Sequence, residues 1–226
     1  MIEDIEDLME GQMESMGVRA LYISCVGSHM WGMQNRESDI DLAAVYAAPT
    51  RSILRGERIY PTIRQQIAPG RGVIYDTIGW EIGQLINQLI KGNINAIWYA
   101  ASPLVVKPSI IQEELSALVK DNLCRGSYRS IKGMAQSQMK SEDKPAEAGK
   151  GRRSALRTIN FGIKLLTEGR IVFAPVLHTP GCEEVREKMI ELDCAYEASS
   201  LPDRPDEEGF REFLLRLRLE GVQDSE

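Results

Sequence analysis

The sequence has few of the residues that build disulfide or zinc-based scaffolds. Its 226 residues include four cysteines and two histidines, and no two cysteines have the C-x-x-C spacing of a metal or redox motif. Cysteines as scattered as Cys25, Cys124, Cys182 and Cys194 indicate neither a zinc site nor a disulfide framework. Free thiols are typical of a reducing compartment, so the sequence predicts a cytoplasmic protein.

Long apolar runs and an excess of basic residues are also missing. No apolar run reaches the ~18 residues that a membrane-spanning helix needs, and the first residues, MIEDIEDLMEG, are acidic where a signal peptide is basic. The formal net charge is −6, which argues against a broad surface for long nucleic acids, because phosphate backbones require clustered cations. We therefore expect no membrane partner, and we favour a small-molecule or protein acceptor over a long nucleic acid.

What the sequence does contain is a compact motif that begins at Gly27. An apolar, strand-like run (residues 21–26) ends at Gly27-Ser28, and Asp39 and Asp41 follow in a second strand-like run. On a strand, two residues separated by one position leave the same face, about 6–7 Å apart at Cα. Carboxylates this close repel each other unless a hard cation such as Mg²⁺ lies between them. Because a Gly-Ser turn after a strand also presents N–H groups and a hydroxyl to an anion, the motif predicts adjacent metal and phosphate sites.

The order of strand, Gly-Ser turn and Asp-x-Asp strand resembles the DNA polymerase β-like nucleotidyltransferase superfamily. Downstream, the segment from Asp76 through IKGNINAIWYAASPLVV looks like a group of uncharacterised bacterial and archaeal predicted nucleotidyltransferases. The resemblance extends over about residues 18–106. The chain departs from the group at residues 93–95, which read Asn-Ile-Asn where Asn-Pro-Asn is usual, and at Trp98, where Glu is frequent.

This resemblance implies an enzyme that moves a nucleoside monophosphate from an NTP to an acceptor hydroxyl and releases pyrophosphate. ATP is the expected donor, and two Mg²⁺ ions, with Mn²⁺ as a substitute, are the expected cofactors. Gly27 and Ser28 would bind the phosphates, while Asp39 and Asp41 would be shared by the metals. The alternative is an antitoxin-like or regulatory module that uses the same fold to bind a nucleotide or a partner.

A third carboxylate is needed on the acceptor side, and the candidates are Asp76, Glu81 and Glu57. Asp76 belongs to a β-rich run in which it shares a strand face with Ile74 and Ile78. An unpaired charge is costly to bury between two isoleucines, which favours a functional role, and the resemblance places the third aspartate on the strand before such a helix. We therefore predict Asp76 as a metal ligand and general base; a helix cap or an exposed strand end is the structural alternative.

Cations that bind phosphate are expected from the second half of the chain. Arg153, Arg157 and Lys164 have the spacing i, i+4, i+11, which places them on one face of a helix. We predict that these three residues bind the nucleotide. A solvated basic face is the structural alternative.

The chain is predicted to be α+β, with two domains. Residues 1–106 would form a small mixed β-sheet nucleotidyltransferase domain with flanking helices, and residues 107–226 an all-helical domain with a disordered tail. The length suits one or two domains, each with a substantial core. Apolar periodicity predicts helices over residues 2–16 and 82–90, strands over residues 19–26, 40–47 and 72–78, and a loop or short strand within residues 50–70.

Overall fold

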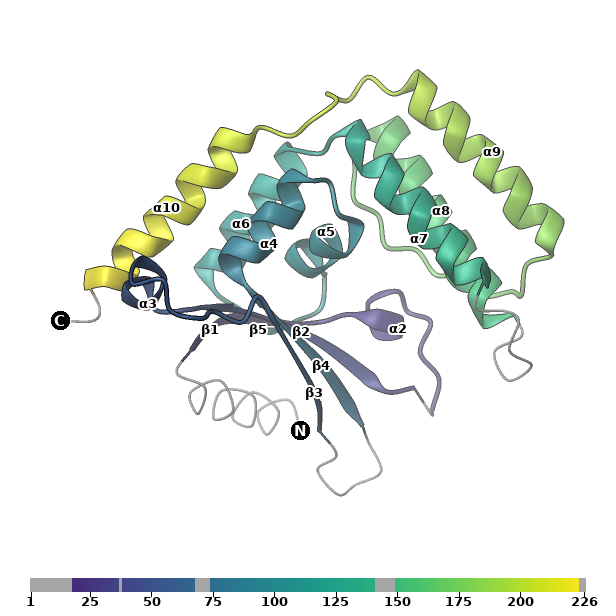
Figure 1. Ribbon diagram of the computed structural model, residues 1–226. Helices are drawn as coiled ribbons and strands as arrows, with labels where there is room; N and C mark the ends of the chain where they lie inside the picture. The colour runs from purple at the N-terminus through teal and green to yellow at the C-terminus, as the bar shows by residue number, and fades with distance from the viewer. Residues whose placement is uncertain (1–17, 37, 68–73, 141–148, 224–226) are drawn as a thin grey trace.

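The computed structural model describes residues 18–36, 38–67, 74–140 and 149–223. A mixed five-stranded sheet carries helices on one face, and further helices extend beyond the sheet (Figure 1). The predicted α+β fold class is therefore confirmed. The helix predicted for residues 2–16 and the end of the predicted tail, residues 224–226, lie outside the described residues.

Five strands form the sheet in the order β3-β4-β2-β1-β5. The central strands β2 and β4 run parallel, and every other neighbouring pair is antiparallel. The strands are β1 Arg19–Cys25, β2 Ile40–Ala47, β3 Thr62–Ile67, β4 Tyr75–Glu81 and β5 Val105–Lys107.

The two motif strands match the predicted ranges, whereas the edges of the sheet do not follow from the sequence. β4 begins later than the predicted run over residues 72–78 and continues to Glu81, because its parallel pairing with β2 extends that far. β3 is the short strand left open within residues 50–70, and β5, three residues long, was not predicted. Both are edge strands: β3 is mostly polar, and β5 is too short to show a strand pattern.

The helices lie almost entirely after the second strand. They are α2 Gly27–Met30, α3 Thr50–Leu54, α4 Ile82–Ile90, α5 Ile94–Ala101, α6 Ile110–Asp121, the 3-10 turn η1 Arg125–Ser127, α7 Tyr128–Lys140, α8 Lys150–Glu168, α9 Cys182–Ala198 and α10 Glu207–Gln223. Helices α4, α5 and α6 cover the sheet, and α7, α8 and α9 form a layered group beside them (Figure 1). Among the described residues, no helix combines the length and the apolar character needed to cross a bilayer.

Local sequence explains where the two helices nearest the site begin. Helix α4 starts as β4 ends, where the Glu81 carboxylate accepts a hydrogen bond from the Gly83 N–H at 2.7 Å. Asn93 begins α5 by accepting the Asn95 N–H through its side-chain oxygen at 2.9 Å. Side-chain acceptors at these positions satisfy backbone donors that have no partner within the helix. After β4 the chain therefore forms α4 and α5 on one face of the sheet and returns to the sheet at β5.

One hydrophobic core joins the sheet to both groups of helices. It includes Ala43 and Val45 of β2 together with Phe161 of α8. Trp31 and Trp98 pack edge to face with a centroid separation of 5.3 Å, and each also meets the Phe161 ring. These aromatic contacts fix α8 against the sheet beside the Gly-Ser turn.

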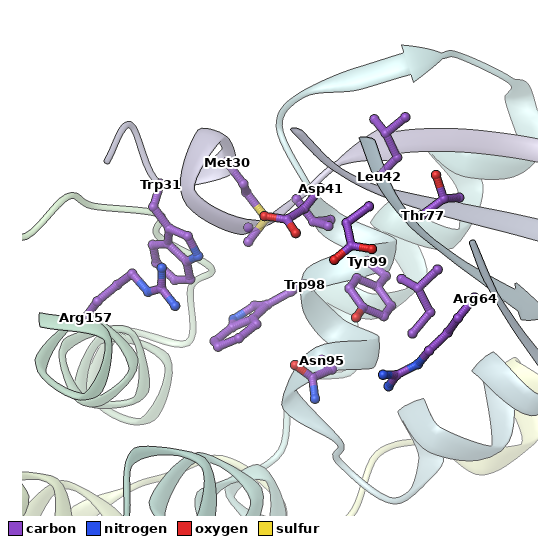
Figure 2. Close-up of a pocket in the computed structure, with 14 residues that line it drawn as sticks. Met30, Trp31, Asp41, Leu42, Arg64, Thr77, Asn95, Trp98, Tyr99 and Arg157 are labelled. Carbon is purple, nitrogen blue, oxygen red and sulfur yellow. The ribbon is translucent and has the colours of Figure 1, made fainter. Parts of the chain in front are cut away.

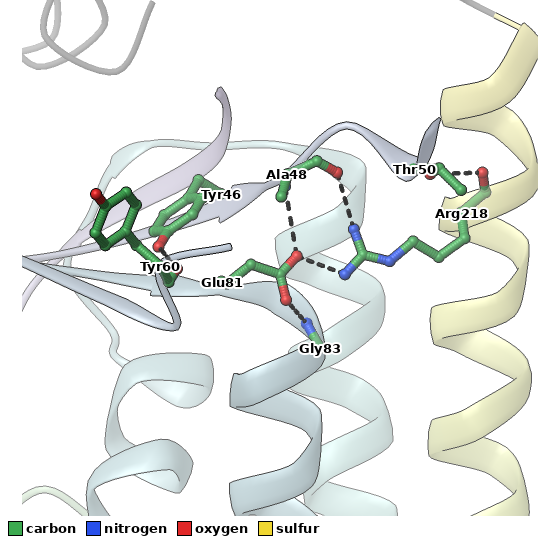
Figure 3. Close-up of polar contacts among 7 residues, drawn as sticks. All are labelled: Tyr46, Ala48, Thr50, Tyr60, Glu81, Gly83 and Arg218. Atoms are coloured by element: carbon green, nitrogen blue, oxygen red, sulfur yellow. Dashed lines mark hydrogen bonds and ion pairs between the residues drawn. The ribbon is translucent and has the colours of Figure 1, made fainter. Parts of the chain in front are cut away.

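The last helix returns from the helical half to the sheet. α10 lies along α4 and reaches α3, as Figure 1 shows. There the Arg218 guanidinium forms an ion pair with Glu81 and donates a hydrogen bond to the Ala48 carbonyl at 3.1 Å (Figure 3). The Thr50 hydroxyl donates to the Arg218 carbonyl at 3.0 Å. The end of α10 is thus bonded to the end of β2 and the start of α4.

Candidate active site

Two of the predicted carboxylates lie side by side on the parallel central strands. Asp41 of β2 is the direct register partner of Asp76 of β4. Register partners on adjacent strands project from the same face of a sheet. Asp41 and Ala43 are two residues apart on β2, so they share a face, and Ala43 belongs to the main core beneath the helices. Asp41 and Asp76 therefore project from the face that carries the helices. Asp39 lies just before β2 and is exposed. The sheet therefore brings Asp76, from a distant part of the sequence, next to the Asp-x-Asp motif.

The turn after β1 packs closely against Asp41. Gly27 has a φ of 60°, and a Cβ at this position would lie only 1.7 Å from the Asp41 Oδ2 atom. The Val26 N–H donates to the Asp41 carbonyl at 2.8 Å, and the Ser28 N–H donates to the Asp41 carboxylate. Glycine is required here both by the positive φ and by this close approach. The predicted phosphate turn and the predicted metal strand thus meet at one carboxylate.

The environment of Asp41 disfavours its negative charge. Burial raises the pKa of this half-buried carboxyl, and the nearby Asp76 and Asp39 raise it further, while His29 and the Ser28 N–H lower it. The raised pKa reflects a charge that has lost water and faces like charges. A bound cation would reverse this balance.

Arg157 of α8 approaches Asp41 from the helical side. Its guanidinium Cζ lies 4.7 Å from the Trp31 ring centroid and 5.9 Å from that of Trp98. Burial lowers the pKa of Arg157 to about 10, and the nearby Asp41 opposes this effect. The Arg157 Nε is buried without a hydrogen-bond partner among the described residues. A cation beside two indole rings, with an N–H that has no partner among the described residues, is suited to an anionic ligand.

These groups line one pocket of about 290 Å³. Its walls come from the Gly-Ser turn, the two central strands, α5 and α8, and Figure 2 shows the Asp41 carboxylate between Arg157 on one side and Arg64 on the other. Of the predicted site residues, Gly27, Asp41, Asp76 and Arg157 line the pocket. Ser28 and Asp39 are connected to it through Asp41, the first by a hydrogen bond and the second by charge.

Two predicted phosphate ligands lie away from this pocket. Lys164 forms an ion pair with Glu168 at 3.2 Å and lines a separate hollow along α8. Arg153 lies one helical turn before Arg157 and is absent from the pocket wall. The structure therefore brings one of the three predicted cations, Arg157, to the carboxylates.

The alternatives to Asp76 are engaged elsewhere. The Glu81 carboxylate is buried and bonded to Arg218 and to the Gly83 N–H (Figure 3). Glu57 follows α3, lines a different pocket and lies 3.8 Å from Arg55. Among the three candidates, only Asp76 lies beside Asp41.

Sequence reasoning missed part of the pocket wall. Arg64 of β3, Asn95 of α5 and Tyr99 of α5 line it, and none of them was assigned a functional role from the sequence. Arg64 comes from an edge strand whose pairing cannot be read from its own residues. Burial raises the pKa of the Tyr99 hydroxyl, which the nearby Arg64 opposes.

The donor set fits a hard cation that a substrate helps to hold. Within the described ranges, no three His, Cys, Asp or Glu side chains form a ready-made metal site. Mg²⁺ commonly uses only one or two protein carboxylates and completes its octahedron with substrate phosphates and water. Asp41, whose charge is disfavoured by Asp76 and Asp39, supplies oxygen ligands of this kind. Asp41 and Asp76, register partners on adjacent strands, could hold such an ion together with substrate oxygens, and the exposed Asp39 would have to turn toward it to become a third ligand.

Carboxylates on neighbouring strands beside a Gly-Ser turn define the fold and site of a nucleotidyltransferase-like protein of the DNA polymerase β-like superfamily. The chain belongs to the RlaP family, described as the RNA repair pathway DNA polymerase beta family, whose family model matches residues 1–171. The matched range includes the whole pocket and ends just after α8.

The chain is also similar to individual proteins, among them one relative and one solved structure. An uncharacterized protein of Methanocaldococcus jannaschii is 23% identical over 120 residues, which cover 53% of this chain and 49% of that protein. The chain thus spans about half the length of that relative. The crystal structure of a nucleotidyltransferase-like protein from Exiguobacterium sibiricum 255-15 aligns with a TM-score of 0.33 and 12% identity, covering 91% of this chain and 69% of that one.

Proposed function

We propose that this chain is a metal-dependent nucleotidyltransferase that transfers a nucleoside monophosphate from an NTP, with ATP as the expected donor, to an acceptor hydroxyl. The observation that carries the proposal is the direct register of Asp41 and Asp76 beside the Gly27-Ser28 turn, in a pocket that also holds Arg157. Nucleotidyl transfer needs carboxylates, a phosphate cradle and a compensating cation at one place. These side chains supply all three.

Each residue has a role in this proposal. The Ser28 hydroxyl and the N–H groups after Gly27 bind the β- and γ-phosphates, and Arg157 neutralises charge that develops on the leaving pyrophosphate. Asp39 and Asp41 would hold the cation on the nucleotide side. When bound, Mg²⁺ or Mn²⁺ stabilises the attacking and leaving oxygens of an in-line displacement.

Asp76 acts on the acceptor side. The acceptor oxygen forms a bond to the α-phosphorus as the bond to the bridging oxygen breaks, and pyrophosphate leaves. Asp76 accepts the proton of the acceptor hydroxyl, a role that requires hydrogen-bond reach to that hydroxyl. Its exposure at the pocket gives such a hydroxyl access.

Two observations support a proposal for the acceptor. The family is described by an RNA repair pathway, while a net charge of −6 disfavours a long basic track for nucleic acid. A terminal hydroxyl that enters the pocket satisfies both. We therefore place the end of a molecule, rather than an extended polymer, in the site.

The test combines binding and turnover. Calorimetry with a non-hydrolysable ATP analogue should show affinity that increases with Mg²⁺, and the Asp39→Asn, Asp41→Asn double variant should lose this increase. Incubation with each α-labelled NTP and candidate acceptors should show transferred label. The matched control is Glu57→Gln, which removes a carboxylate outside the pocket. The proposal would be refuted if the wild type bound the ATP analogue with the same affinity in the presence and absence of Mg²⁺.

Asp76→Ala separates chemistry from binding. If Asp76 is the general base, this variant should keep its affinity for the metal-bound NTP analogue, while turnover falls by about 10²–10⁴. Metal-enhanced binding without turnover in the wild type would instead favour a nucleotide-binding regulatory module. Equal loss of affinity and turnover in the variant would move Asp76 to the nucleotide side.

A further inference from the structure

Arg64 occupies the end of the pocket opposite Arg157. In β3 it pairs with Ile78 of β4, while Gln66, two residues further along, pairs with Asp76. Side chains two residues apart share a strand face, and so do register partners on neighbouring strands. Arg64 therefore lies on the same face as Asp76, displaced by two residues along the strand. Figure 2 shows Asp41 between Arg157 and Arg64, and both arginines line the same pocket. Two cations therefore flank the carboxylates from opposite ends.

The Arg64 end of the pocket holds polar groups that the protein itself does not satisfy. Arg64, Asn95 and Tyr99 all line the pocket. Within the described ranges, none of their side chains makes a hydrogen bond or ion pair. In Figure 2 the Arg64 guanidinium and the Asn95 amide approach each other from β3 and from α5. A guanidinium beside an amide and a phenol is a donor-rich surface for an oxygen-rich ligand.

Arg64 is on the acceptor side of the site. The Gly27-Ser28 turn and Arg157 border Asp41, so the donor triphosphate belongs at that end. β4 and then β3 lie progressively further from the turn, in the sheet order β3-β4-β2-β1. A group bound by Arg64 therefore lies beyond Asp76 as seen from the triphosphate.

We propose that Arg64, with Asn95 and Tyr99, forms a subsite for a phosphate that the acceptor carries one sugar away from its reacting hydroxyl. This inference rests on the proposed nucleotidyl transfer and specifies the acceptor as a phosphate-bearing sugar. Arg64 binds the acceptor phosphate through a paired set of N–H donors, the geometry in which a guanidinium matches phosphate. Asn95 and Tyr99 contact the sugar hydroxyls. An acceptor without this phosphate loses the contact and leaves the exposed Arg64 guanidinium to water.

The test compares three probes by equilibrium titration of the full chain with the nucleotide site saturated by a non-hydrolysable ATP analogue and Mg²⁺. The probes are the dinucleoside monophosphate ApA, ribose 5-phosphate and adenosine. ApA represents a polynucleotide end, ribose 5-phosphate a small sugar phosphate, and adenosine a sugar with no phosphate. The wild type should bind at least one phosphate-bearing probe about tenfold to 100-fold more tightly than adenosine, the range for hydrogen bonds to a charged group.

Arg64→Ala should abolish this preference, and Arg64→Lys, which keeps the charge but not the paired donors, should retain part of it. The affinity for the ATP analogue should change less than about twofold in both variants, since Arg64 is on the acceptor side. Arg55→Ala is the matched control, because Arg55 is an exposed arginine outside this pocket. Its probe affinities should equal those of the wild type.

The outcomes separate this inference from the proposed function. No wild-type preference for phosphate, or a preference that survives Arg64→Ala, overturns the subsite whether or not the ATP analogue binds. An equal loss of ATP-analogue affinity in Arg64→Ala also overturns it and assigns Arg64 to the donor. Failure of the wild type to bind the ATP analogue refutes the proposed function, and the three titrations, repeated without analogue, still decide whether Arg64 recognises phosphate.

Discussion

Asp41 carries a charge that the metal-free fold opposes. Burial and two neighbouring carboxylates raise its pKa, so the folded state binds a proton more readily than the unfolded chain. The associated stability is present below the ordinary pKa of the group and is lost as the pH rises through the raised value. Ionised Asp41 near neutral pH therefore destabilises the protein until a cation binds.

Replacing Asp41 with asparagine should stabilise the metal-free protein at pH 7. Asparagine keeps an oxygen for the Ser28 N–H and removes the repelling charge. The melting temperature in EDTA should increase by about 2–4 °C for each 1 kcal/mol of relieved repulsion. The difference should decrease as the pH falls through the raised pKa of the wild-type Asp41 carboxyl toward the ordinary range of an aspartate, about 4. Thermal unfolding of both proteins across this pH range is the measurement, with Glu57→Gln as the exposed control. A lower melting temperature for Asp41→Asn at pH 7 would contradict the electrostatic account.

The four cysteines should differ sharply in reactivity. Cys25 and Cys124 are buried, whereas Cys182 and Cys194 are exposed. Burial, with a smaller contribution from Asp41, raises the pKa of the Cys25 thiol to about 11, so almost no reactive thiolate forms there at pH 8. A disulfide reagent should modify Cys182 and Cys194 quickly in the native protein and all four cysteines after denaturation. Rapid labelling of Cys25, located by peptide mapping, would show that β1 opens in the native state.

Among the helices, α8 depends on a close approach to its neighbours. A Cβ at Gly162 would lie 2.6 Å from Ile131 Cγ2 of α7 and 2.9 Å from Leu192 Cδ1 of α9. Gly133, on α7, has open space at its Cβ position: beyond its own helix backbone, no atom of the described residues lies within 4 Å. The two glycines therefore form a matched pair, one packed and one open.

Alanine at these two positions should have opposite effects. Gly162→Ala forces apart three helices and should cost about 1–3 kcal/mol, while Gly133→Ala should gain about 0.5–1 kcal/mol from the lower entropy of the unfolded chain. Urea unfolding of both variants tests this prediction. A neutral result at Gly162 would mean that α7 and α9 adjust without strain.

Elements with a clear apolar period could be predicted from the sequence. β1 and β2 contain continuous apolar runs, and α4 buries one stripe at helical spacing, Ile82, Leu85, Ile86 and Leu89. β3 reads Thr-Ile-Arg-Gln-Gln-Ile and β5 has only three residues, so neither has a pattern distinct from a loop. Edge strands form here because a neighbour offers hydrogen bonds, which is information outside the segment.

The site residues divide in the same way, into those that local sequence groups and those that depend on strand pairing. Gly27, Asp39 and Asp41 lie within one short motif, and local spacing was enough to group them. Asp76 was added to this group as a hypothesis, and the β2–β4 register places it beside Asp41. Arg64 could not be assigned, because its position depends on the pairing of β3 with β4. Helical spacing grouped Arg153, Arg157 and Lys164 on one face of α8. Spacing alone does not show which part of that face lies against the sheet, and only Arg157 of the three lines the pocket.

For the molecule as a whole, the return of α10 is a separate source of stability. The Arg218 and Glu81 side chains are 16% and 7% exposed. Removing one partner of a buried ion pair leaves the other charge uncompensated, at a cost of about 3–5 kcal/mol. The exposed pair of Arg211 with Glu207 on the same helix belongs to a class worth at most about 1 kcal/mol.

Arg218→Ala should therefore lower the melting temperature far more than Arg211→Ala, by about 2–4 °C for each 1 kcal/mol lost. Adding Glu81→Gln to Arg218→Ala should recover part of the loss, because the stranded charge is removed. Differential scanning calorimetry of the three variants gives the comparison. Equal effects of the two arginine substitutions would show that α10 is not held by this pair.

The same contact has a consequence for the order in which the polypeptide is made. The sheet and its flanking helices emerge from the ribosome before α10, the last element described. Until α10 emerges, α4 and α3 lack the contacts that they make with it. Domains commonly fold one after another during synthesis, beginning at the N-terminus. Here the Glu81 carboxylate lacks Arg218, and the side of α4 that packs on α10 stays uncovered, until α10 is translated. We expect a nascent chain stalled before Glu207 to expose this surface to chaperones and proteases, so that completion of the sheet and its helices depends on a helix translated much later.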